Sequence, residues 1–226
     1  MADLPIIFSA PMVQALLDGR KSQTRREIKP RPIHPECRKA LFSRRPDGSG
    51  GQWAWWFLGA LLPFAEIRLR YAVGDRLYVR EAHALVPASA YRMSEGVEQA
   101  IDPSEAGRAC VYRAGFDRSN GGIRWRSPIH MPRWASRLTL TVTDVRVERL
   151  QEISEADAQA EGFPISWDGK PYDPPSPQED SWQGYGRASM SLYWNSLHGP
   201  DAWAANPWVA AISFTVSRGN IDGGDA

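Results

Sequence analysis

The sequence is poor in the features that mark secreted and membrane-spanning proteins. Its 226 residues include only two cysteines, Cys37 and Cys110, which form no CxxC pair and indicate no disulfide framework. No apolar run approaches the roughly 18–20 residues that a membrane-spanning helix requires. The segment Met1–Pro5 lacks the basic start and long apolar stretch of a signal peptide. We therefore expect a cytoplasmic protein, in a reducing compartment, with no membrane partner.

Several widespread catalytic and cofactor-binding patterns are also missing. The four histidines are dispersed, with neither HxH nor HxxxH spacing, so we predict no metal centre. The patterns GxxxxGKS/T, GxGxxG and GxSxG do not occur, which argues against P-loop nucleotide hydrolysis, dinucleotide binding and a nucleophile-elbow hydrolase. We therefore expect no metal and no cofactor.

Charge is nearly balanced over the whole chain but is unevenly distributed. A net charge of +1 argues against a uniformly basic nucleic-acid surface. Between Arg20 and Arg45, however, ten lysines and arginines face only two acids, Glu27 and Glu36. Such a concentration would attract a phosphate-bearing partner, although a basic loop without a partner is the alternative.

The chain combines several short strand patterns with few helical ones. Strand patterns cover 5–8, 66–70, 76–81, 110–113, 137–149 and 208–216, and the phase of the apolar residues changes near Asp144. Helices are predicted from Ser9 to Gly19, from Ser154 to Gly162, and around 192–197. This pattern is typical of a mainly β protein with a few α-helices, built on a small closed or partly open β-barrel.

We expect one domain over 1–218, with a flexible tail at 219–226. Segments near 27–51, 82–108 and 164–184 are rich in proline or weakly periodic, and we interpret them as long loop insertions. The first of these is expected to be a mobile, basic excursion.

The octet Gly19–Arg26 is the most informative stretch. Its amine, Lys21, and its hydroxyl, Thr24, would share a face on a helical turn but would lie on opposite sides of a flat strand. Because the preceding helix should end at Gly19, we expect the octet to begin as a tight turn. An amine beside a hydroxyl can act as base and nucleophile if the amine loses its proton. A solvated basic turn is the alternative.

These patterns resemble those of a known family. The pattern Gly-x-Lys-x-x-Thr-x-Arg at 19–26, together with Gly74-Asp75, the segment 154–162 and Asn-Pro-Trp-Val at 206–209, is similar to the ASCH-domain family, whose fold is a PUA-like barrel. The amino-acid sequence of residues 129–137 is similar to that of a longer, Trp-rich subgroup carried by bacteriophages and prophages. The resemblance covers most of the chain and implies a PUA-like fold.

The resemblance also implies an activity. Some small bacterial members are amidohydrolases that deacetylate N4-acetylcytidine with a lysine, a threonine and a glutamate, which fall here on Lys21, Thr24 and Glu161. Thr24 would attack the amide carbonyl, Lys21 would remove its proton, and Glu161 would orient Lys21 or assist proton delivery to the leaving amine. If Glu161 instead keeps Lys21 as ammonium, Lys21 would hold the oxyanion and Glu161 would activate Thr24 or a water.

Glu161 also raises a local question of charge. An acid on the last turn of a helix is unfavourable with respect to the helix dipole, so we expect a compensating cation nearby and assign Lys21 to that role.

Further residues are assigned to substrate binding. Arg26 suits a phosphate or a carbonyl of the substrate, and the other candidates lie at the end of a strand or in a segment that mixes cations and aromatics: Arg80, Glu81, His130, Arg133 and Trp134. A structural role is the alternative for each, and Arg80 with Glu81 could form an ordinary rim ion pair. The expected partner is a modified nucleoside or a nucleic acid. A non-catalytic RNA- or DNA-binding module and a ribonuclease remain open as other functions.

Overall fold

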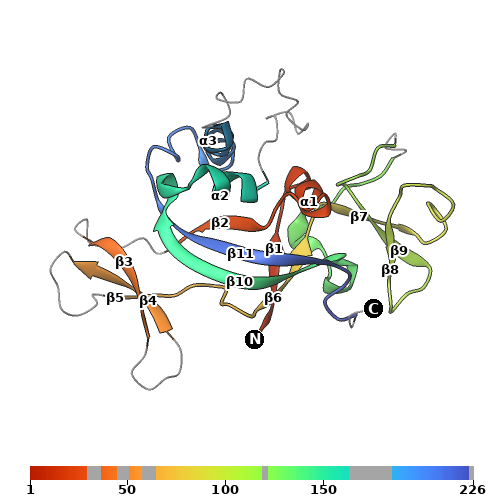
Figure 1. Ribbon diagram of the computed structural model, residues 1–226. Helices are drawn as coiled ribbons and strands as arrows, with labels where there is room; N and C mark the ends of the chain where they lie inside the picture. Colours follow the sequence, from red (N-terminus) through yellow and green to blue (C-terminus); the bar gives the residue numbers. More distant parts are fainter. Residues whose placement is uncertain (30–36, 45–50, 58–64, 119–121, 163–184, 224–226) are drawn as a thin grey trace. The chain divides into compact units, whose positions relative to one another are not determined.

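The computed structural model describes residues 1–29, 37–44, 51–57, 65–118, 122–162 and 185–223 (Figure 1). Its strands are β1 (Asp3–Ile7), β2 (Gln23–Glu27), β3 (Cys37–Arg44), β4 (Gly51–Phe57), β5 (Ala65–Ile67), β6 (Arg76–Arg80), β7 (His83–Pro87), β8 (Gln99–Ile101), β9 (Arg108–Tyr112), β10 (Leu138–Arg149) and β11 (Trp208–Arg218). Its α-helices are α1 (Ala10–Leu17), α2 (Glu155–Ala160) and α3 (Tyr185–His198), and three 3-10 turns are η1 (Pro128–His130), η2 (Arg133–Ala135) and η3 (Leu150–Glu152). The protein is mainly β with few helices, as the sequence predicts. The predicted insertion at 164–184 lies outside the described residues.

The chain divides into two compact units. Unit 1 contains residues 1–22, 73–143 and 214–226, and unit 2 contains residues 23–72 and 144–213. The division falls inside β10 and inside β11, so each of these long strands contributes to both units.

Unit 1 contains strands in the order β1-β6-β10-β11. Strand β1 runs parallel to β6, with Leu4 opposite Leu77, and β10 runs antiparallel to β6, with Leu140 opposite Leu77. Pro5 fits in β1 because a proline cannot donate a backbone hydrogen bond and is tolerated at a sheet edge, where β1 lies. Alternate residues of these strands are buried and form much of the core of the unit.

Helix α1 confirms the sequence prediction for residues 9–19. Ser9 takes the N-cap position, Pro11 lies in the first turn, and Gly19 adopts a φ of 72° that a residue with a side chain rarely takes. The apolar stripe of the helix is buried, including Met12, Val13 and Leu16.

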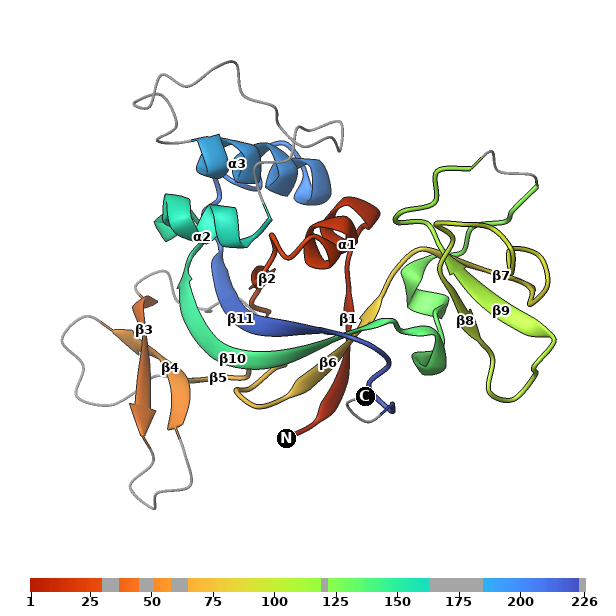
Figure 2. The ribbon, with the colours of Figure 1, turned by 45° about the vertical axis from the view of Figure 1, so that its right-hand side comes forward.

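A second sheet in unit 1, visible in Figure 2, has the order β7-β9-β8. Its three strands are antiparallel, with Leu85 and Ala100 both opposite Cys110. The sheet includes most of the segment that the sequence suggests is a weakly periodic insertion at 82–108. Its strands are short and separated by polar turns, which weakens the alternating pattern on which strand prediction depends.

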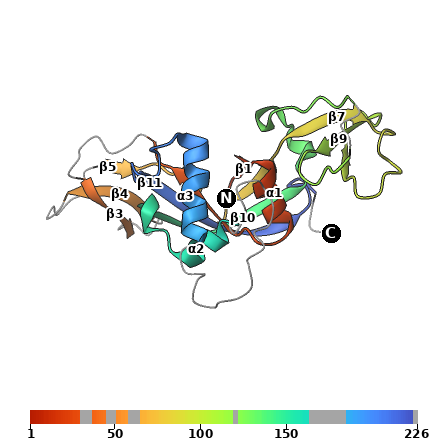
Figure 3. The same ribbon diagram turned by 90° about the horizontal axis from the view of Figure 1, so that it is seen from above.

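Unit 2 contains strands in the order β10-β11-β2 and the helices α2 and α3. Strand β2 runs antiparallel to β11, with Thr24 opposite Ile212. Helices α2 and α3 lie side by side, as Figures 2 and 3 show. Ser154 caps α2 by accepting a hydrogen bond from the backbone N–H of Asp157 at 3.0 Å, as predicted, and Gly162 follows the helix with a φ of 99°.

The octet turns at Gly19 but does not continue as a helical turn. From Gln23 onward it is strand β2, so Thr24 lies on an extended segment and not on a helical turn. The pairing with β11, which lies almost 190 positions later in the chain, imposes the extended conformation on Thr24.

The segment 27–51 also differs from its prediction as a loop. Part of it is strand β3, which pairs antiparallel with β4 and, through β4, belongs to the order β3-β4-β5. Four prolines and many cations conceal this strand in the sequence.

Three further sequence predictions are confirmed. Strand β10 has Leu138, Leu140 and Val142 buried on one phase and Val147 buried on the other, which matches the predicted change of phase near Asp144. Helix α3 and strand β11 lie where the sequence places them.

Among the described residues no strand pairing closes any sheet into a barrel. None of the described helices has the length and apolar character needed to cross a membrane.

Candidate functional site

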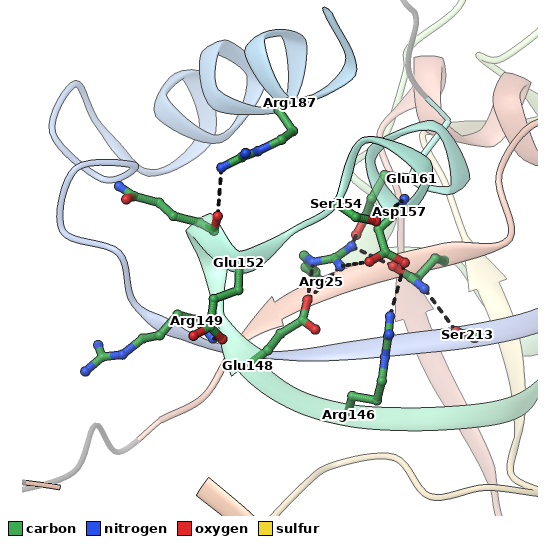
Figure 4. A network of polar contacts seen from close by, with 12 residues as sticks. Arg25, Arg146, Glu148, Arg149, Glu152, Ser154, Asp157, Glu161, Arg187 and Ser213 are labelled. Carbon is green, nitrogen blue, oxygen red and sulfur yellow. Dashed lines mark hydrogen bonds and ion pairs between the residues drawn. The ribbon is translucent and has the colours of Figure 1, made fainter. Parts of the chain in front are cut away.

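A buried arginine organises the polar cluster of unit 2, which Figure 4 shows. Strand β2 carries Arg25, whose side chain is fully buried. Its guanidinium donates to Glu148 Oε1 at 2.6 and 2.9 Å, to Glu161 Oε1 at 3.2 Å and to Gln23 Oε1 at 2.6 Å. Asp157 Oδ2 lies 3.4 Å from the same group. One cation therefore holds carboxylates from β10 and from both ends of α2.

Local chain chemistry explains why these acids gather there. Asp157 lies in the first turn of α2, where the helix dipole favours a carboxylate. Burial raises the pKa of Asp157, but hydrogen bonding with Ser154 and Arg146 outweighs it, and the net pKa lies below the ordinary value of 3.8. Arg146 donates to Asp157 Oδ1 at 3.1 Å. Asp157 is therefore held as a carboxylate between two arginines.

Glu161 occupies the C-cap of α2 and is only 4% exposed. The helix dipole disfavours an acid at this end, and Arg25 supplies a compensating cation at 3.2 Å. The sequence assigned this role to Lys21 and missed Arg25. The signal that could have identified Arg25 is its position in the middle of the five-residue strand β2, which pairs with β11.

Lys21 belongs to unit 1 and is among its most deeply buried side chains, with 1% exposure. Its Nζ lies 5.4 Å from the centroid of the Phe8 ring, within the range of a cation–π interaction. Its backbone N–H donates to the carbonyl of Ala15 at 3.1 Å, which anchors the residue to α1. A buried lysine is rare unless it is paired or functional.

Thr24 belongs to unit 2 and is 4% exposed. It follows Gln23, whose side-chain amide donates to Ser213 Oγ at 3.1 Å, and it precedes Arg25. The three residues that the family resemblance singles out, Lys21, Thr24 and Glu161, are thus all buried. Thr24 and Glu161 lie in one unit, and Lys21 lies near the end of the first segment of the other, two residues before Gln23 begins unit 2.

Arg26 lies within electrostatic range of Glu161 and of the phenol groups of Tyr71 and Tyr193. Burial raises the pKa of the Tyr71 phenol, while Arg70 and Arg26 act in the opposite direction. The guanidinium of Arg70 lies 5.5 Å from the centroid of the Tyr71 ring. Arg26 therefore has both an acidic and an aromatic environment within unit 2, which suits recognition of a polar aromatic molecule.

In unit 1, Arg80 and Glu81 have separate partners. Arg80 donates to the backbone carbonyls of Met131, at 3.0 Å, and Ile129. Glu81 is 1% exposed and receives two hydrogen bonds from Arg137, at 2.9 and 3.0 Å. The suggestion that Arg80 and Glu81 pair with each other is wrong, because neighbouring side chains on an extended strand point to opposite faces.

Burial affects the ionisation of the Glu81–Arg137 pair. Burial raises the pKa of Glu81 above its ordinary value of 4.5, and the hydrogen bonds from Arg137 only partly oppose this. Arg137 also donates to Glu98 Oε2 at 2.5 Å and to the carbonyl of Ala114 at 3.1 Å. The guanidinium lies 4.0 Å from the centroid of the Tyr112 ring.

The remaining predicted binding residues also have intramolecular contacts. Arg133 binds Asp3 at 2.7 Å and Asp222 at 2.6 Å. Trp134 packs against a buried cluster that includes Cys110 and Met131. His130 is exposed, in the 3-10 turn whose carbonyls Arg80 binds. The structure thus brings Arg80 to the turn that contains His130 and gives Glu81, Arg133 and Trp134 structural partners.

Within the described ranges, no group of three or more histidine, cysteine or acidic side chains is arranged to hold a metal ion. Three carboxylates of unit 2, those of Glu148, Asp157 and Glu161, instead contact the guanidinium of Arg25.

Comparison with known proteins adds little. No family model matches the sequence, and no curated protein matches it. A crystal structure of protein EF3133 from Enterococcus faecalis, described as belonging to family DUF984, is similar to all of this chain over 86% of its own length. The TM-score is 0.36 and the sequence identity is 11%, a likeness too low to carry an argument about function.

Proposed function

We propose that the protein is an amidohydrolase that removes the acyl group from an N-acylated pyrimidine nucleoside such as N4-acetylcytidine. The observation that supports this is the burial of Lys21, Thr24 and Glu161, the amine, alcohol and acid expected from the resemblance to the ASCH-domain family. Burying three such groups is costly unless they are paired or take part in chemistry. No metal or cofactor is needed for the reaction.

In the proposed reaction, Thr24 Oγ1 attacks the acyl carbon and its proton passes to a base. The tetrahedral intermediate then collapses, the C–N bond breaks, and the leaving amine takes up a proton. Water hydrolyses the acyl-threonine and releases a carboxylic acid. The mechanism requires the Lys21 amine to lie within hydrogen-bond reach of Thr24 Oγ1 when substrate is bound.

Arg25 acts as a positioning residue in this proposal. Its bond to Glu161 Oε1 at 3.2 Å restrains one carboxylate oxygen. Arg26, near Glu161 and two tyrosines, would contact the pyrimidine or a phosphate.

The direct test is incubation of the purified protein with N4-acetylcytidine, with chromatography of cytidine and acetate. Thr24→Ala should abolish turnover, because no other group in the scheme supplies the nucleophile, whereas Thr24→Ser should retain part of it. Ser22→Ala removes an exposed hydroxyl two residues away and serves as the matched control. Turnover by Thr24→Ala at the parent rate would exclude Thr24 as the nucleophile, and a folded parent that cleaves no N-acylated pyrimidine nucleoside would refute the function.

The pH–rate profile of Lys21→Arg tests whether Lys21 acts as a base or as a cation that holds the oxyanion. An arginine remains protonated at all accessible pH values, so Lys21→Arg cannot act as a base. Loss of activity at every pH supports Lys21 as the base. Retained activity with an altered pH–rate profile would mean that the cation at position 21 stabilises the oxyanion and that Glu161 transfers the proton.

A further inference from the structure

A groove in unit 1 is lined by two arginines and a tyrosine over an apolar surface. Its volume is about 360 Å³, and its lining residues are Leu85, Val86, Pro87, Ala90, Tyr91, Gly122, Ile123, Arg124 and Arg126. This volume lies at the lower end of the roughly 300–1,000 Å³ typical of ligand sites. None of the lining residues that the structure describes is acidic.

The arginines project from a fixed backbone. The backbone N–H of Arg126 donates to the carbonyl of His83 at 2.7 Å, and the N–H of His83 donates to the carbonyl of Arg126 at 3.3 Å. This bridge joins the segment 124–126 to β7. In an extended segment, residues two apart lie on the same side, about 6–7 Å apart. Arg124 and Arg126 accordingly both line the groove, whereas Trp125 does not.

An aromatic cluster connects the two walls of the groove. Trp125 contacts Phe116 edge-to-face, with centroids 5.2 Å apart, and Phe116 contacts Tyr91 in the same way at 5.5 Å. Arg113 lies over the Trp125 ring at 5.3 Å. The cluster therefore links Tyr91 to the segment that carries the arginine pair, without involving the guanidinium groups of Arg124 and Arg126.

The two guanidinium groups are exposed and available to a ligand. Within the part of the chain that the structure describes, no carboxylate forms an ion pair with Arg124 or Arg126. Between residues 113 and 126 there are four arginines and one acid, Asp117. Unpaired arginines on a rigid support bind phosphate oxygens well, because the planar guanidinium offers two donors to each phosphate.

We propose that this groove binds single-stranded nucleic acid, with successive phosphates on Arg124 and Arg126 and a base against Tyr91. Arginine pairs alone would suit any polyanion, but the aromatic side chain and the apolar side chains that line the groove with them suit the flat, apolar face of an unpaired base. The groove lies entirely within unit 1 and its occupancy does not depend on hydrolysis, so the inference stands or falls independently of the proposed function.

The test is fluorescence anisotropy of the intact protein with a labelled 12-nucleotide oligouridylate, over a series of salt concentrations. Each phosphate contact on a single strand contributes about 0.7 to the slope of log affinity against log salt. Arg124→Gln or Arg126→Gln should therefore lower the slope by about 0.7 and weaken binding by about fivefold at 0.1 M salt. Arg68→Gln removes an exposed arginine that does not line the groove and should change binding less than twofold.

The aromatic contact has its own variants. Tyr91→Ala should weaken binding by about tenfold with little change of salt slope, because a stacked base contributes without an ionic contact. Tyr91→Phe keeps the ring and should restore binding, which separates stacking from misfolding. Circular dichroism and the thermal midpoint check the fold of each variant.

Three results would overturn the inference. The first is equal weakening by Arg68→Gln, which would show that only overall charge matters. The second is binding of heparin or of a matched duplex as tightly as the single strand, with Tyr91→Ala without effect. The third is no salt-dependent retention of the oligonucleotide by the folded parent.

Discussion

Replacing Arg25 by methionine should destabilise the protein strongly. The substitution keeps an unbranched side chain but removes a fully buried guanidinium that contacts three carboxylates. Removing one partner of a buried ion pair typically costs about 3–5 kcal/mol, because the remaining charge is left without compensation. The cost should fall on the less exposed carboxylates of the cluster, Glu148 and Glu161, since Asp157 keeps its contact with Arg146.

The size of this effect can be measured by urea denaturation of parent and variant. Against a usual unfolding free energy of about 5–15 kcal/mol, a loss of about 3 kcal/mol should lower the midpoint clearly and reduce the melting temperature by about 6–12 °C. The matched control is Arg146→Met, because Arg146 is 42% exposed and bonds to one carboxylate of the same cluster. Its loss should cost less than about 1 kcal/mol.

The difference between parent and Arg25→Met should also depend on pH. The pKa of Asp157 is lowered in the folded protein, so its contribution to stability is present above about pH 3.8 and is lost as the pH falls through the lower folded value. Arg25 is one of the causes of this lowering, after Ser154 and Arg146, so Asp157 contributes to the difference between parent and variant. The stability difference should therefore shrink as the pH falls below about 4. A difference that is the same at pH 3 and pH 7, or a total cost below that of Arg146→Met, would refute the electrostatic account of this cluster.

Two other predictions concern buried groups of unit 1. Burial raises the pKa of Glu81, so the stability linked to its protonation is complete below pH 4.5 and declines as the pH rises through the raised value. In urea denaturation, the unfolding free energy of the parent relative to that of Glu81→Gln should therefore be higher at pH 4 than at pH 7. A difference that does not change with pH would contradict this. Burial likewise raises the pKa of the Cys110 thiol to about 12. In a Cys37→Ser background, Cys110 should react with a disulfide reagent at pH 8 only after denaturation, and rapid labelling of the folded protein would show that the thiol is accessible.

The sequence predicted elements well where local signals agree. Ser9, Pro11 and Gly19 delimit α1, and the long alternation of Leu138, Leu140 and Val142 identifies β10, because both depend on residues close together in the chain. Strands β3, β7 and β8 were not predicted, since pairing with neighbouring strands, and not their own patterns, makes them strands, whereas the pattern at 110–113 did indicate β9.

The candidate site shows the same limit. Glu161 was correctly placed at the end of α2 from local signals. Arg25 was not recognised as its partner, because the two residues are separated by 136 positions and only the folded sheet brings them together. The suggested ion pair between Arg80 and Glu81 was wrong for the opposite reason. Their adjacency in the sequence suggested a contact that an extended backbone does not allow.

Arg133 holds Asp3 and Asp222 on the same guanidinium, at 2.7 and 2.6 Å. This contact therefore links two positions at opposite extremes of the chain, and a contact across such a long stretch has a high entropic cost of closure. It should form late in folding and separate early in unfolding. The same proximity means that a short peptide could join residues 3 and 222, so that a circularly permuted protein, opened in an exposed turn elsewhere, should reach the same fold.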